Sequence, residues 1–329
     1  MDNFTRSSHN MFVSQAINRA GIRGRKKEWI RDHLGDPESF FVPVWQSRVL
    51  VSDGDEPRPI LLSYSQARQF AGNDDESVFL GREEGRCYFA VSIQTPDAAP
   101  PAELTALGRF RDLRAVGPLL SQNDGALLAY AKIITYWHGR NRFCGVCGSP
   151  NRVSQGGHQR TCSDPGCGAL HFPRTDPAII VLVRSGEKCL LGRQSVWPER
   201  MYSVLAGFVE PGESAEAAVV REVFEETSVR VTNIHYHSSQ PWPFPCSLMI
   251  GFCAEAEGEE VCLRDRELED ARWFSREEFR TAVEGGAIRL PSRISIAHQL
   301  IRDWFDAQSP VPLRELATPE RTAYYGDRK

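Results

Sequence analysis

The sequence predicts an α+β protein with three parts: a β-rich amino-terminal domain, a zinc ribbon and a carboxy-terminal α/β sandwich. The 329 residues exceed the usual size of one hydrophobic core, and four cysteines gather between positions 144 and 167. From about residue 175 onward, strand-like and helix-like segments alternate. The expected segments are 1–125, 126–172, 173–310 and a tail, 311–329.

The composition is that of a globular protein, with 41% hydrophobic residues, 25% charged residues and a formal net charge of −4. This mild acidity argues against a general nucleic-acid-binding protein. The amino terminus has no apolar signal segment, and no apolar run approaches the roughly 18 residues that span a bilayer. We therefore expect a cytoplasmic protein with no membrane partner.

Short apolar runs separated by Gly-, Pro- and Asp-rich segments predict strands in the amino-terminal domain. The expected strands are 39–45, 48–52, 59–64 and 87–94. Tyr130, Ala131, Ile134 and Trp137 then recur at helical spacing, which predicts an amphipathic helix over 126–138.

The carboxy-terminal part begins with two runs, 178–184 and 188–194, that are typical of paired strands. Further strands are expected at 202–210, 248–256 and 269–274, and helices at 214–226, 275–286 and 294–308. The proline-rich stretch 239–247 is expected to be a loop.

The cysteines follow the pattern C-x2-C-x14-C-x4-C, at Cys144, Cys147, Cys162 and Cys167. Two short cysteine pairs supply the four soft ligands of tetrahedral zinc, and four protein ligands leave no open position, so this zinc is expected to be structural. His158 and His171 are reserve ligands, although surface or core histidines are the more usual interpretation. The alternative is a set of buried or incidental thiols.

A second pattern is the acidic helix expected over 214–226, with Ser214 as its N-cap. Helical spacing places Glu222, Glu225 and Glu226 on one face. It places four residues on the other face: Ala217, Val220, Val223 and Phe224. Crowded carboxylates suit magnesium or manganese that also holds phosphate oxygens. The alternative is a solvated acidic face.

This stretch resembles the signature of the Nudix hydrolases, whose fold is an α/β/α sandwich. The matching residues are Gly207, Glu213, Arg221, Glu222, Val223, Glu225, Glu226 and Val229. Ser228 stands where the family has glycine, at the expected helix exit, where a left-handed conformation costs a non-glycine residue ~1–2 kcal/mol. Glu213 is expected in the preceding loop, in a structural role.

The resemblance implies roles for several residues. Glu222, Glu225 and Glu226 would hold the catalytic metals, with the Ala206 carbonyl and Glu267 as further ligands. Arg221 would orient a glutamate, and Glu225 or Glu226 would act as the base. Phe172 and Phe208 resemble ring-stacking residues, and Ala297 would lie near the base pocket.

The stretch "SQPWPFPCS" (239–247) combines three prolines with two large aromatic side chains. The prolines pre-set the backbone, and the aromatic rings offer flat surfaces to a base. The stretch resembles the segment that marks the NADH pyrophosphatase branch, with Cys246 where the branch often has glutamine. The implied substrate-binding residues are Gln240, Pro241, Trp242, Pro243, Phe244, Pro245, Cys246 and Ser247. The alternative is a rigid core-packing turn.

The implied reaction is metal-dependent hydrolysis of the NAD(H) pyrophosphate to NMN(H) and AMP, with removal of NAD caps from RNA 5′ ends as a further expectation. The branch also implies a homodimer. Two alternatives remain: a Nudix hydrolase of ADP-ribose or a diadenosine polyphosphate, and a zinc-ribbon nucleic-acid-binding protein with an inactive hydrolase domain. The intact glutamates and the absence of a basic surplus count against the second alternative.

Overall fold

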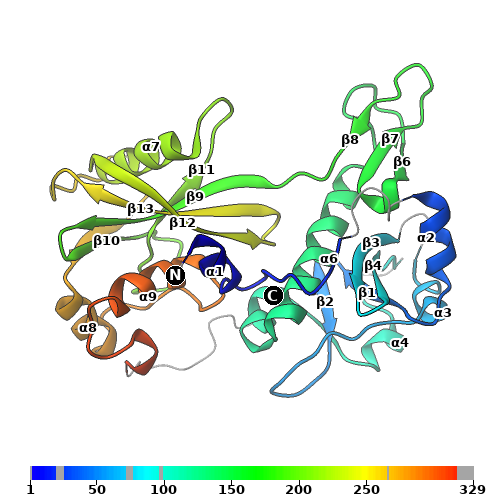
Figure 1. The fold of residues 1–329 in the computed structure, drawn as a ribbon, viewed down its shortest axis with the longest axis horizontal. Helices are drawn as coiled ribbons and strands as arrows, with labels where there is room; N and C mark the ends of the chain where they lie inside the picture. The colour runs from blue at the N-terminus through cyan, green and yellow to red at the C-terminus, as the bar shows by residue number, and fades with distance from the viewer. Residues whose placement is uncertain (1, 20–25, 72–76, 96–98, 265–266, 317–329) are drawn as a thin grey trace. The chain divides into compact units, whose positions relative to one another are not determined.

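The computed structural model describes residues 2–19, 26–71, 77–95, 99–264 and 267–316, which fall into two compact units (Figure 1). The amino-terminal unit comprises Phe12–Thr175 and Trp242–Cys246. The sandwich unit comprises Met1–Met11, Asp176–Pro241 and Ser247–Lys329. Neither unit is continuous in sequence, because Trp242–Cys246 groups with the amino-terminal unit and the first residues of the chain group with the sandwich unit.

The amino-terminal unit is built on a five-stranded sheet with the order β3-β4-β1-β2-β5. Its strands are β1 (Ser39–Trp45), β2 (Arg48–Val51), β3 (Val78–Glu83), β4 (Arg86–Ser92) and β5 (Arg109–Arg111). Phe41, Phe79 and Phe89 form the centre of its core. The helices of this unit are α2 (Lys27–Leu34), α3 (Tyr64–Ala67), α4 (Ala102–Thr105), α5 (Leu113–Val116) and α6 (Gln122–Arg140).

Helix α6 is the long helix expected from the sequence, although it begins four residues earlier than predicted, after the N-cap Ser121. It contacts β1, β3 and β4. The zinc-ribbon segment follows it, with a three-stranded sheet in the order β6-β7-β8. These strands are β6 (Asn151–Ser154), β7 (Gln159–Cys162) and β8 (Leu170–His171).

The sandwich unit contains a six-stranded sheet with the order β12-β13-β9-β10-β14, in which β11 also pairs with β9. The strands are β9 (Asp176–Ser185), β10 (Lys188–Arg193), β11 (Leu205–Phe208), β12 (Val231–Trp242), β13 (Ser247–Ala256) and β14 (Asp270–Phe274). Its helices are α1 (Asn3–Ser8), α7 (Ala215–Thr227), α8 (Arg276–Glu284) and α9 (Ile296–Asp306).

Two cores lie on opposite faces of this sheet, because successive side chains of a strand point to opposite sides. Ile179 and Val181 of β9 pack in the cluster that contains the buried residues of α7. Ile180 and Leu182 pack in the cluster that contains the buried residues of α8 and α9. Figure 1 shows α7 on one side of the sheet and α8 and α9 on the other. The predicted α/β/α layering is therefore confirmed.

Two sequence-based expectations for local structure are wrong. Residues 59–64 form isolated bridges at Pro59 and Leu62, and Tyr64 already opens α3, because Ser63 provides a capping box for that helix. The expected loop at 239–247 is mostly strand, since β12 extends to Trp242 and β13 starts at Ser247. Strand β12 lies at the sheet edge, where proline is tolerated, and its polar sequence concealed it.

Candidate functional site

Helix α7 is fixed at both ends by side-chain and backbone hydrogen bonds. The Ser214 hydroxyl accepts a hydrogen bond from the Ala217 amide at 3.1 Å, as the N-cap prediction requires. At the other end, Ser228 adopts a left-handed conformation with φ 61°, and its amide donates to the Phe224 carbonyl at 2.8 Å. The expected left-handed helix exit is therefore confirmed, with serine in a position that favours glycine.

Arg221 connects three glutamates around this helix. Its Nε and Nη2 atoms donate to the Glu213 carboxylate at 2.8 and 2.9 Å, and Nη1 donates to Glu222 at 2.8 Å and to Glu225 at 3.1 Å. Nη2 also donates to the Phe208 carbonyl at 2.9 Å. Glu213 lies in the loop before α7, and its hydrogen bonds to Arg221 hold the pKa of its carboxyl at about 2. Glu213 therefore anchors the arginine.

Glu222 is seated against the backbone of β11. A Cβ atom built on Gly207 would lie 1.9 Å from the Glu222 carboxyl carbon, so the carboxylate occupies space that only glycine leaves open. Burial raises the pKa of Glu222, Arg221 lowers it, and the charges of Glu225 and Glu267 raise it. The Glu267 carboxylate accepts a hydrogen bond from Gln194 at 3.3 Å.

The sequence-based assignment of the α7 faces needs correction. The buried face consists of Ala218, Val219, Val223, Glu226 and Thr227. Of the four residues expected on the apolar face, only Val223 is buried, and Val220 is 43% exposed. Glu226 is 2% exposed and Glu225 is exposed, so the three glutamates do not share one solvated face. Helical periodicity placed the glutamates along the helix but did not show which face of α7 packs against the sheet. The sheet leaves room for a carboxylate there because Gly207 has no side chain.

The glutamate cluster is a set of hard oxygen donors, which suits a divalent cation such as magnesium or manganese. Ala206 is the residue before Gly207 on β11, paired with Ile180 of β9, which places its backbone beside the Glu222 seat. Among the described residues, no three carboxylates bring their oxygens within 4.8 Å of one another. Arg221 Nη1 donates to both Glu222 and Glu225, so this guanidinium occupies part of the space between the two carboxylates.

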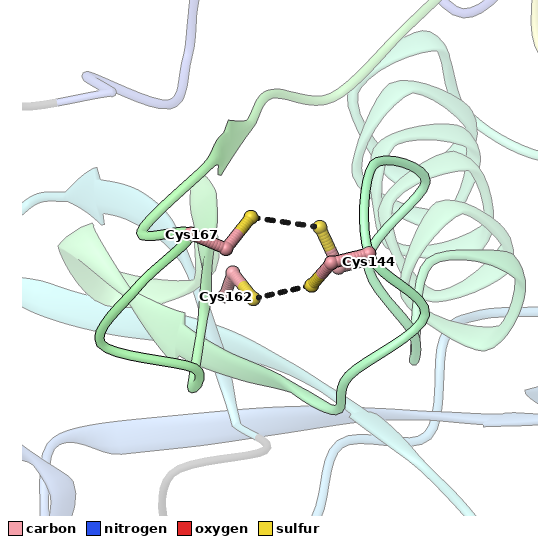
Figure 2. Close-up of side chains that lie close together, drawn as sticks. Cys144, Cys162 and Cys167 are labelled. Atoms are coloured by element: carbon pink, nitrogen blue, oxygen red, sulfur yellow. Dashed lines mark hydrogen bonds between the residues drawn. The ribbon is translucent and has the colours of Figure 1, made fainter.

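The four predicted zinc ligands lie together in the ribbon. The Sγ atoms of Cys144, Cys147, Cys162 and Cys167 all lie within 4.8 Å of one another. The Cys144–Cys167 and Cys147–Cys162 sulfur distances are 3.8 and 3.4 Å. Figure 2 shows the side chains of Cys144, Cys162 and Cys167 turned toward a common centre. Tetrahedral zinc with bonds of about 2.3 Å separates its sulfur ligands by about 3.8 Å. The cluster therefore fits zinc.

The two reserve histidines take other partners. His158 Nε2 lies 2.7 Å from the Phe79 carbonyl, which ties the ribbon to β3. His171 Nε2 lies 3.3 Å from Cys144 Sγ, which is within hydrogen-bonding distance of this predicted zinc ligand. Sequence reasoning missed His138, a buried side chain of α6 that bonds to the Gly157 carbonyl at 2.8 Å and to Arg160 at 3.0 Å. Within the amino-terminal unit, these contacts hold the ribbon against α6 and β3.

The proline-rich stretch divides into two strand ends and a hairpin tip, which we define as Trp242–Cys246. Gln240 is fully buried in the sandwich unit, where it donates to the carbonyls of Met11 and Ile294 and accepts from the Ile296 amide. Its side-chain amide therefore holds the backbone of Met11, Ile294 and Ile296 in place. The neighbouring Pro241 is half-buried, and Ser247 is buried.

In the hairpin tip, the half-buried rings of Trp242 and Phe244 meet at a centroid distance of 4.9 Å. Both also contact Phe12, at 6.5 and 6.1 Å. Pro243 and Cys246 are buried, and Pro245 is exposed. The tip therefore combines packing contacts with partly accessible aromatic surface.

The remaining predicted substrate residues differ in accessibility. Phe208, at the end of β11, and Phe172, after β8, are each 60% exposed, so both rings are open for stacking. Ala297, in the first turn of α9, is 2% exposed and belongs to the core on that side of the sheet. Its methyl group is packed against protein in this structure.

Three family models match the chain in order. They are an NADH pyrophosphatase-like rudimentary NUDIX domain over residues 38–137, an NADH pyrophosphatase zinc ribbon domain over 140–172 and a NUDIX domain over 173–291. Among the described residues, no helix is long and apolar enough to cross a membrane.

The chain is also similar to individual proteins. The NAD-capped RNA hydrolase NudC of Mycobacterium bovis is 42% identical over 241 residues, which cover 70% of this chain and 75% of that protein. The NAD-capped RNA hydrolase NUDT12 of Homo sapiens is 42% identical over 196 residues, 56% of this chain and 42% of that protein. A crystal structure of a NUDIX hydrolase from Nitrosomonas europaea has a TM-score of 0.41 and 21% identity, covering 51% of this chain and 92% of that one. By the extent of the match to NudC, the chain belongs to the Nudix hydrolase family, in the branch that carries the NADH pyrophosphatase zinc ribbon.

Proposed function

We propose that this protein hydrolyses the pyrophosphate of NAD(H) to NMN(H) and AMP and removes NAD caps from RNA 5′ ends. The observation that carries the proposal is the carboxylate cluster of α7, with Glu222 seated against Gly207 and Arg221 bonded to three glutamates. The printed names of the relatives, NAD-capped RNA hydrolases, support the choice of substrate.

The Nudix domain implies dependence on a divalent metal, for which we propose magnesium or manganese. When bound, such ions neutralise the pyrophosphate and lower the pKa of a water molecule. We assign the ligands to five residues: Ala206 through its carbonyl, Glu222, Glu225, Glu226 and Glu267. Arg221 orients Glu222 and Glu225, and Glu225 or Glu226 accepts the proton of the attacking water.

We propose that aromatic stacking recognises the dinucleotide. Phe172 and Phe208 are the most accessible predicted rings, and Trp242 adds a partly accessible surface in the hairpin tip. Gln240, Pro241, Ser247 and Ala297 are enclosed to different degrees, so we propose that they support backbone near the bound dinucleotide and do not stack on its rings. The other tip residues, Pro243, Phe244, Pro245 and Cys246, hold the Trp242 ring in place, with Phe244 in direct contact with it.

We propose a structural zinc ion in the ribbon, a homodimeric assembly and a cytoplasmic location. The four-thiol set leaves no ligand position for a reactant, and all nine cysteines are free thiols, as expected in a reducing compartment. Light scattering after size exclusion would measure the assembly, and a monomeric mass at micromolar concentration would contradict the dimer.

The substrate proposal is tested by chromatography of products from NADH, NAD, ADP-ribose, a diadenosine polyphosphate and NAD-capped RNA, each with Mg²⁺, with Mn²⁺ and with EDTA. The expected result is metal-dependent formation of NMN(H) and AMP, with capped RNA releasing NMN. Preferential cleavage of ADP-ribose or the diadenosine compound would mean that this compound, and not NAD(H), is the main substrate. Binding of RNA with no hydrolysis of any compound would indicate an inactive hydrolase domain.

A further inference from the structure

Lys132 is a buried lysine on α6, outside every motif recognised in the sequence. It is 6% exposed, and its Nζ atom donates a hydrogen bond of 2.6 Å to the Pro243 carbonyl in the hairpin tip. The two residues are 111 positions apart in the chain and belong to the same unit. A side chain of the amino-terminal unit therefore binds the backbone between the two aromatic residues of the tip.

The same ammonium group also contacts the ring of Phe244. Lys132 Nζ lies 4.5 Å from the ring centroid, and Arg114 Cζ lies 4.4 Å from it. Both distances are within the range of cation–π attraction, which is stronger where the cation is desolvated. Phe12 meets the ring edge-on at 6.1 Å. Two cations and a second ring thus surround Phe244, which limits its availability to a substrate base.

Burying this ammonium group is costly, since the charge leaves water. Burial lowers the pKa of Lys132 to about 8, the charge of Asp112 raises it, and the charge of Arg114 lowers it. The acceptor that the ammonium group reaches is a carbonyl, and carbonyl hydrogen bonds to a charged donor are among the stronger ones. The Lys132 ammonium group therefore favours the tip conformation in which the Pro243 carbonyl accepts its hydrogen bond.

We propose that Lys132, supported by Arg114, is a positioning residue for dinucleotide recognition. It fixes the Pro243 carbonyl and the Phe244 ring, so that Phe244 is an anchor and Trp242 is the tip ring presented to substrate. This inference rests on the proposed function, in which Trp242 stacks on a ring of the dinucleotide. It extends that function by assigning a specificity role to helix α6.

The test is steady-state kinetics with NADH and metal for Lys132→Met, which keeps the aliphatic stem and removes the charge. KM should rise about tenfold, the change expected from losing a hydrogen bond to a charged group, while kcat stays within about twofold. Lys132→Arg should restore KM to within about threefold of wild type, because it restores the cation. An unchanged KM in Lys132→Met, or an equal loss of kcat, would overturn the assignment.

Thr135→Val is the matched control, because Thr135 is buried on the same helix and, within the described part of the chain, its hydroxyl bonds only to α6 carbonyls. Its KM should match wild type even if the protein is less stable. If Lys132→Met fails to fold, Arg114→Gln replaces it, and a KM below about twice the wild-type value would overturn the proposal.

Hydrogen exchange tests the role of Lys132 independently of the proposed function. Peptides covering Trp242–Cys246 should exchange faster in Lys132→Met than in Thr135→Val, whatever the substrate is. If wild-type protein does not hydrolyse NADH, the proposed function fails while exchange still decides whether Lys132 holds the tip. Equal exchange in both variants would overturn the positioning role.

Discussion

Gly207 and Glu222 illustrate what single residues contribute to the site. The signature spacing predicted both residues, but only the structure reveals that the Glu222 carboxylate occupies the space beside the Gly207 Cα atom. A sequence pattern specifies residue types at intervals, whereas their contact depends on how α7 packs across β11. The ligand and base roles of Glu222, Glu225, Glu226 and Glu267 stay predictions that require kinetics.

Gly207→Ala should displace Glu222, because the added Cβ would lie 1.9 Å from the carboxyl carbon. Misplacing a catalytic group by about 1 Å can cost ~10²-fold, so we expect kcat to fall by about two decades while circular dichroism stays unchanged. Gly258→Ala is the control, since a Cβ there meets nothing within 4 Å. Normal turnover in Gly207→Ala would show that the Glu222 seat is dispensable.

Helix α7 and strand β12 show how far patterns predict whole elements. The cap, the length and the left-handed exit of α7 follow from local chemistry at Ser214 and Ser228, and each was predictable. The buried face was not, because Glu226 lies among the valines that face the sheet. Strand β12 was missed because an edge strand lacks apolar alternation. Its Ser239 amide donates to the Ser7 hydroxyl, and its Ser239 carbonyl accepts from the Asn10 side chain.

Ser228→Gly should stabilise the sandwich unit, because glycine adopts φ 61° without the steric cost borne by serine. Ser228→Ala is the comparison, since both variants lose the hydroxyl bond to the Cys262 carbonyl at 2.9 Å. In urea unfolding we expect the glycine variant to exceed the alanine variant by about 1 kcal/mol. Equal stabilities would mean that the helix exit relaxes without cost.

For the whole molecule, the three-part α+β architecture was predictable, because a cysteine pattern and a hydrolase signature each specify a module. The grouping of the hairpin tip with the amino-terminal unit was not predictable. The hairpin tip joins the amino-terminal unit through contacts of Phe12, Arg114 and Lys132, which are distant in sequence and carry no motif. Contacts of that kind arise from tertiary packing, so spacing along one chain does not indicate them.

Cys144→Ser should remove the ribbon zinc and destabilise the amino-terminal unit. Serine is a poor zinc ligand, and metal binding free energy at such a site is folding free energy. We expect elemental analysis to find the ribbon zinc lost and Tm to fall by about 5–10 °C. Cys262→Ser should change neither, because that exposed thiol lies outside the cluster. Full zinc content with unchanged Tm in Cys144→Ser would contradict a structural zinc site.

The most direct test of the account is the rate of NADH cleavage by Glu225→Gln and Glu226→Gln, measured as NMNH and AMP by chromatography at saturating metal. Each change removes a charge from α7 with little change in shape, so the account predicts folded proteins whose kcat falls at least ~10²-fold. Glu216→Gln, in the exposed first turn of the same helix, should turn over at the wild-type rate. Near-normal turnover in both test variants would mean that the α7 carboxylates do not carry the reaction.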